Sequence, residues 1–179
     1  MGRGNVCVFQ KYEGLFYIDN DDIHEYRCYD DVTGETEYRK QGELSYEDLT
    51  GGHWRYDEDL SQQNWEDTKA DFVDAMLARF PSLSYCDKWI EHDRHALLEN
   101  KLFYIATADN EWSMAVMLIQ KEHWCHNIEG LQKQHFQKYL DGIRDCLFEQ
   151  FETLGTYGGA WTSGRISRSD FQKGGVQSA

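Results

Sequence analysis

Two pairs of histidines are the residues of this sequence that are best suited to bind a metal ion. His92 and His95 are separated by two residues, and so are His123 and His126, with Cys125 inside the second pair. Imidazole and thiolate groups are ligands that zinc prefers. The two pairs flank the same predicted hairpin, so folding would be able to bring all four histidines together at one site.

A metal at these histidines would predict a hydrolase, with Asp93 or Glu122 as the general base for a metal-bound water. The same residues also have a plainer interpretation. Residues three apart converge on one face of a helix, whereas both pairs lie in predicted turns. We therefore favour ordinary polar histidines and predict neither a cofactor nor an enzyme, while the metal-dependent hydrolase stays an alternative.

Other groups of reactive side chains carry weaker signals. The run Asp19, Asp21 and Asp22 resembles the start of a calcium loop, but Ile23 occupies the position of a third oxygen ligand. The cysteines form an odd set without CxxC spacing, which predicts free thiols in a reducing cytoplasm. They are Cys7, Cys28, Cys86, Cys125 and Cys146.

Negative charge is the strongest feature of the sequence. Acids outnumber bases 32 to 18, and the first 60 residues alone hold 15 acids against 6 bases. This charge disfavours nonspecific binding to DNA or anionic lipid and favours basic partners. Tyrosines between the acids are typical of interfaces. The predicted partner-binding residues are Asp19, Asp21, Asp22, Glu25, Asp30, Asp31, Glu35 and Glu37, with Tyr26 and Tyr29.

A long hairpin over residues 102–120 is the element that must organise the fold. Two apolar runs flank the polar tetrad that begins at Asp109, a pattern typical of paired strands. Residues that point to either side of each strand are apolar. The hairpin must therefore lie at the centre of a sheet that is covered on both faces.

Two amphipathic helices are predicted around this hairpin. Apolar residues at helical spacing indicate a helix over residues 62–80, with Asp59 or Ser61 as its cap, and another over 128–151. Short strands are expected at 15–18, at 25–31 paired with 35–40, at 83–91, and as one glycine-rich strand near 156–166. Consecutive strands with short links favour an α+β fold with an antiparallel sheet.

The length of 179 residues fits one domain. We predict a single α+β domain over residues 1–166, in which 1–58 form an acidic, β-rich subregion, followed by a disordered tail over 167–179. The longest apolar run, Met114 to Ile119, is far shorter than the roughly 20 residues that span a bilayer. We therefore expect no membrane segment.

Several segments resemble a family of small proteins carried on phages and integrative elements of gut Firmicutes. They are MGRGNV, EGLFYIDNDDIHEYR, NWEDTKADFVDAMLARFPSL, ALLENKLFYIATADNEWSMAVMLIQKE, LQKQHFQKYLDGIRDCLFEQF and GTYGGAWTSG. The resemblance spans nearly the whole chain and carries no catalytic motif. Proteins of this size and setting include anti-CRISPR inhibitors of Cas9, so the resemblance implies an inhibitor.

Charge and resemblance together predict a non-enzymatic inhibitor that acts in the cytoplasm of the host bacterium. Its expected partner is a basic nucleic-acid-handling defence protein, Cas9 or Cas9 with its guide RNA, because such effectors hold nucleic acid in positively charged channels. The acidic ribbon would supply the contact. An accessory protein of the mobile element, such as a homodimer joined through an edge strand, is a further alternative.

Overall fold

The structure is a computed structural model that describes residues 14–90, 93–109, 114–121, 131–158 and 161–171. The predicted α+β class is confirmed, and all strand pairs that the structure describes are antiparallel. The chain divides into two compact units. The small unit is Asp19–Asp71, and the sheet unit comprises the described residues up to Ile18 and from Phe72 on.

The sheet unit is built on a seven-stranded sheet with the order β10-β9-β1-β8-β7-β6-β5. The strands are β1 (Gly14–Tyr17), β5 (Ser84–Trp89), β6 (Arg94–Glu99), β7 (Phe103–Asp109), β8 (Met114–Gln120), β9 (Thr153–Gly158) and β10 (Trp161–Ser167). Strands β5 to β8 are neighbours in the sequence and in the sheet. In the turn before β7, the Asn100 side chain accepts hydrogen bonds from the Leu102 and Phe103 amides, each at 2.8 Å.

The predicted hairpin is confirmed as β7 and β8, which lie at the middle of this sheet. Every residue of β8 is buried. On one face, Phe103 of β7 packs against the rings of Phe136 and Tyr139. On the other face, Ala106, Met117 and their neighbours form a separate apolar cluster. Both faces are therefore covered, as the two-sided apolar pattern predicts.

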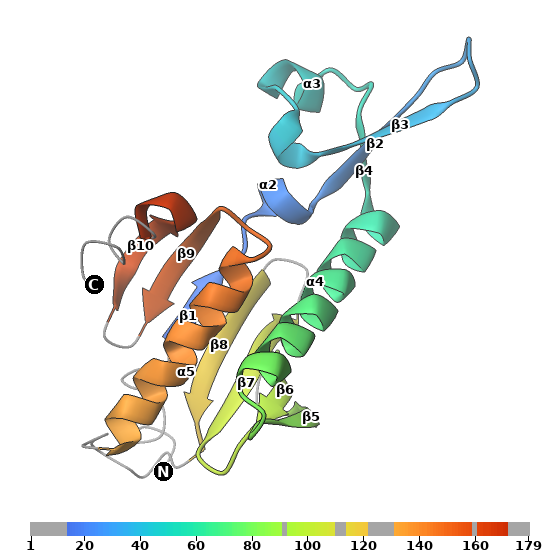
Figure 1. Ribbon diagram of the computed structural model, residues 1–179. Coiled ribbons are helices and arrows are strands. Elements are labelled where there is room, and N and C mark those ends of the chain that lie inside the picture. The colour runs from blue at the N-terminus through green and yellow to red at the C-terminus, as the bar shows by residue number, and fades with distance from the viewer. Residues whose placement is uncertain (1–13, 91–92, 110–113, 122–130, 159–160, 172–179) are drawn as a thin grey trace. The chain divides into compact units, whose positions relative to one another are not determined.

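Two long helices are present, with bounds that differ from the predicted ones. Helix α4 (Glu58–Arg79) begins four residues before position 62, because Asp57 and neither Asp59 nor Ser61 caps it. Helix α5 (Leu131–Phe148) ends before position 151, where the Gln150 amide closes a tighter turn on the Leu147 carbonyl. Residues 128–130 lie outside the described residues. Helix α5 runs along β8 and β9 (Figure 1).

The C-terminal part of the chain contains more paired strands and more side-chain contacts than the sequence predicts. The glycine-rich segment forms two paired strands, β9 and β10, instead of one. Residues 167–171, which open the predicted disordered tail, are instead held by contacts. The Arg168 guanidinium donates to the Phe148 carbonyl at 2.7 Å and pairs with Glu152 at 2.9 Å. Residues 172–179 lie outside the described residues.

The small unit contains a three-stranded sheet with the order β3-β2-β4. Its elements are α2 (Asn20–Ile23), β2 (Glu25–Tyr29), β3 (Thr36–Lys40), the 3₁₀ turn η1 (Gln41–Glu43), α3 (Tyr46–Thr50), β4 (Arg55–Asp57) and α4 as far as Asp71. The predicted pairing of 25–31 with 35–40 is confirmed. Strand β4 pairs only with Glu25 to Arg27, so the β2–β3 hairpin continues past it as a two-stranded ribbon (Figure 1).

Candidate interaction surface

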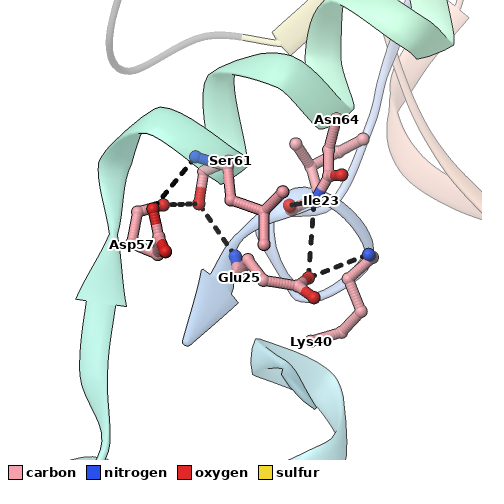
Figure 2. Close-up of polar contacts among 7 residues, drawn as sticks. Ile23, Glu25, Lys40, Asp57, Ser61 and Asn64 are labelled. Carbon is pink, nitrogen blue, oxygen red and sulfur yellow. Dashed lines mark hydrogen bonds and ion pairs between the residues drawn. The ribbon is translucent and has the colours of Figure 1, made fainter. Parts of the chain in front are cut away.

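A buried carboxylate holds the small unit together. Glu25 is only 8% exposed, and its carboxylate accepts hydrogen bonds from the Lys40 ammonium at 2.8 Å and from the Asn64 amide at 3.3 Å. The same Asn64 amide donates to the Ile23 carbonyl at 2.9 Å. These contacts tie β2, β3 and α4 to one another (Figure 2). The Glu25 side chain is therefore engaged within the unit and is poorly placed to meet a partner.

A second set of contacts joins the start of α4 to β2. The Ser61 hydroxyl donates to the Asp57 carbonyl at 2.6 Å and accepts from the Glu25 amide at 2.8 Å (Figure 2). The Asp57 carboxylate accepts from the Leu60 amide, as an N-cap residue does. Because these groups are buried and satisfied, they fix the angle at which the sheet meets the helix within this unit.

The tip of the β2–β3 hairpin is a rigid, exposed turn. The Asp30 side chain accepts from the Val32 amide at 2.8 Å, and the Gly34 amide donates back to the Asp30 carbonyl at 2.8 Å. Gly34 has a φ of +74°, which favours glycine. The Thr33 hydroxyl accepts from the Glu35 amide. Val32 is 94% exposed at the apex, so a turn fixed by its own hydrogen bonds presents an apolar side chain.

The acids at the start of the unit also have local roles. The Asp19 side chain caps α2 by accepting from the Asp21 amide, and the Asp21 carboxylate accepts from the Gln41 side chain at 3.0 Å. Asp22 lies exposed in the first turn of α2. These carboxylates lie in capping and turn positions, and not in the loop geometry of a calcium site.

The predicted partner-binding acids do not share one face of the small sheet. Glu25 and Cys28 are three residues apart on β2, so their side chains point to opposite faces, and Glu37 is paired with Cys28. The acids of the hairpin tip, namely Asp30, Asp31 and Glu35, belong to neither face. Carboxylates therefore surround the hairpin.

Aromatic rings cover the face of the small sheet that carries Glu37. Tyr56 packs edge-on against Tyr26, with ring centroids 5.6 Å apart, and against His24 at 5.0 Å. The Arg39 guanidinium lies 5.4 Å from the Trp54 ring centre and pairs with Glu37 at 2.7 Å. Burial lowers the pKa of His24. Of the two predicted tyrosines, Tyr26 lies on this face and Tyr29 on the opposite one.

Of the predicted histidine cluster, only His95 lies within the described residues. It sits on β6, where its Nε2 contacts the Asp87 carboxylate and its ring lies 4.8 Å from the Trp89 ring. The described residues contain no group of three or more side chains that would hold a metal ion. His92, His123 and His126 lie outside them, so the metal hypothesis stays a prediction.

Two of the described cysteines, Cys86 and Cys146, lack the environment of reactive thiols. Cys28, Cys86 and Cys146 are free. Burial raises the pKa of Cys86 to about 11, with Glu99 beside it adding to the effect, and burial likewise raises the pKa of Cys146 to about 11. A nucleophilic thiolate needs a lowered pKa, so these two thiols are unsuited to that role.

Sequence reasoning missed the groups that shape this surface. The sequence predicts Ser61 only as a possible helix cap and assigns no role to Asp57, although both residues close the buried contacts described above. Sequence reasoning did not single out Arg27 and Arg55, because acidic residues greatly outnumber basic ones in this part of the chain. The two arginines are neighbours because β2 and β4 pair in a particular register. The alternation of residue types along each strand does not reveal that register.

Searches against protein-family models, curated proteins and solved structures found no match for this chain. Among the described residues, no helix has the length and apolar character needed to cross a membrane.

Proposed function

We propose that this protein is a non-enzymatic inhibitor that binds a basic, nucleic-acid-handling protein through its small unit. The observation that carries the proposal is the distribution of charge between the two units. The small unit has 17 acids and 5 bases, so it holds −12 of the chain's net −14 charge. A surface of this charge complements a positively charged groove that normally holds nucleic acid.

The hairpin tip supports this proposal with geometry as well as charge. Val32 at the apex is 94% exposed, and Asp31 and Glu35 flank it with exposed side chains. Because the turn is fixed by its own hydrogen bonds, binding would cost little loop entropy. A rigid tip with an apolar apex and acidic flanks suits insertion between basic side chains.

The sequence resemblance to mobile-element proteins leads us to propose Cas9, alone or with its guide RNA, as the partner. Inhibition would follow from occupying the positively charged channel where the target DNA lies. This role requires no catalytic group on the inhibitor.

A binding experiment with Cas9 from a gut Firmicute tests the proposal. The purified chain would be immobilised and probed with guide-loaded Cas9 over a salt series. We expect affinity to fall as salt rises, because the contact is electrostatic. Absence of binding at low salt, or affinity that is indifferent to salt, contradicts the proposal.

Matched charge reversals locate the binding unit. Asp31→Lys with Glu35→Lys changes two exposed tip carboxylates and should weaken binding by about tenfold or more, which is about 1.4 kcal/mol. Asp74→Lys with Glu149→Lys changes two exposed carboxylates of the sheet unit. This control should bind almost as the unaltered protein does, and equal losses in both variants contradict binding through the small unit.

A further inference from the structure

The basic side chains of the small unit gather on one face of its sheet. The strand register pairs Arg27 of β2 with Tyr38 of β3 on one side and with Arg55 of β4 on the other. Directly paired residues of antiparallel strands point to the same face. Lys40 lies two residues from Tyr38 and shares this face. Three of the five basic residues of an acidic unit are therefore on one surface.

The acids on this face lie beneath the basic groups. Glu25 and Asp57 are each 8% exposed and pair with Lys40 at 2.8 Å and with Arg27 at 3.3 Å. The Arg27 side chain is still 51% exposed, so several of its N–H groups face outward. Arg55 is exposed and forms no ion pair with any residue that the structure describes. The surface presented to solvent is thus rich in cationic donors.

Two exposed tyrosines complete this surface. Tyr38 is 51% exposed beside Arg27, and Tyr29, which is 62% exposed, lies two residues from Arg27 on the same face. Proteins that bind single-stranded RNA combine guanidinium groups for phosphates with aromatic rings on which bases stack. An open sheet face with both kinds of side chain matches that chemistry, and its charge is complementary to phosphate.

We propose that the face formed by Arg27, Tyr29, Tyr38 and Arg55 contacts single-stranded RNA in the partner complex, with phosphates on the arginines and bases on the tyrosines. The inference rests on the proposed function and makes it more specific. In this arrangement, the acidic residues of the unit contact basic side chains of the partner protein. The face with the arginines and tyrosines contacts the RNA that the partner protein holds. The preferred partner is then the protein with its guide RNA bound, and not the protein alone.

The test compares the affinity of the full-length chain for Cas9 with and without guide RNA. We expect the unaltered chain to bind the guide-loaded form at least about tenfold more tightly. The double variant Arg27→Gln with Arg55→Gln should lose this preference and keep its affinity for Cas9 alone. Arg55→Gln by itself should lose part of the preference, and it leaves the ion pair of Arg27 with Asp57 intact.

Arg39→Gln is the matched control, because Arg39 lies on the opposite face of the same sheet. It should keep the preference for guide-loaded Cas9. Circular dichroism of each variant establishes that it folds.

The possible results separate the inference from the function on which it rests. Equal affinity of the unaltered chain for both forms of Cas9 overturns the RNA contact and leaves the proposed inhibitor in place. An arginine variant that loses equal affinity for both forms places protein on this face, which also overturns the RNA contact. Failure to bind either form overturns the proposed function and the inference together.

Discussion

The two units of this protein differ in what stabilises them and in what they present to a partner. The sheet unit has 15 acids and 13 bases, and its core consists of apolar side chains on both faces of β7 and β8. The small unit has a net charge of −12, and its buried residues include Glu25, Asp57 and Ser61. The proposed function assigns recognition of the partner to the small unit and leaves the sheet unit as its scaffold.

The difference also concerns how each unit resists unfolding. Apolar burial stabilises the sheet unit and involves no charges that salt would screen or pH would titrate. In the small unit, buried polar contacts stabilise the fold, while the carboxylates that exceed the basic groups in number repel one another. The small unit should therefore respond to mutation and solvent in ways that the sheet unit does not.

The largest expected effect is a cavity in the sheet unit. Leu118 is fully buried on β8, so Leu118→Ala should lower the free energy of unfolding of that unit by about 3 kcal/mol. Denaturant titration followed by hydrogen exchange with mass spectrometry reads the units separately. Val32→Ala at the exposed hairpin tip is the control and should change stability by less than about 0.5 kcal/mol. A similar loss in both variants would contradict the assignment of this core.

Loss of the buried carboxylate should have a smaller effect, confined to the small unit. Glu25→Gln removes the charge that Lys40 and Asn64 contact, and should lower the free energy of unfolding of that unit by about 2 kcal/mol. Hydrogen exchange in β2 and β3 measures it. Glu43→Gln, at an exposed carboxylate, should leave exchange unchanged. Faster exchange in the strands of the seven-stranded sheet of the Glu25→Gln variant would contradict an effect confined to the small unit.

Salt should stabilise the small unit by about 1 kcal/mol, because screening weakens the repulsion among its carboxylates. The screening length falls from about 30 Å at about 0.01 M to about 3 Å at about 1 M ionic strength. Sodium chloride, whose ions do not strengthen apolar burial as sulfate does, is the suitable salt. Hydrogen exchange across this range should slow in residues 19–71 more than in β7 and β8. Equal slowing in both units contradicts a charge-based difference.

The smallest effect concerns pH. Burial lowers the pKa of His24, so the unfolded chain binds a proton at higher pH than the folded chain does. The stability of the small unit should therefore decline as pH falls through about 6.5, the ordinary value for histidine. His24→Gln should flatten this decline. His53→Gln, at an exposed histidine of the same unit, is the control variant, and both pH profiles are measured by hydrogen exchange.

The sequence predicts the fold better than the site, for reasons visible in particular residues. The apolar pattern of β7 and β8 predicts a central hairpin, because a strand that is buried on both faces is apolar at nearly every position. The start of α4 is misplaced because Asp57 caps the helix from the end of a strand, and several nearby acids look equally suitable. The glycine-rich segment is predicted as one strand instead of two, because its glycines have no side chains that could show an alternation of apolar and polar residues.

The sequence by itself determines the α+β class, the central hairpin and the concentration of negative charge in the first third of the chain. Only the tertiary structure decides that Glu25 is buried while Arg27 and Arg55 lie side by side on an exposed face. The physical reason is that the spacing of apolar residues in the sequence indicates which residues are buried. Contacts between strands depend instead on the register in which the strands pair. Register fixes which charges meet, and it emerges only when separate strands pair.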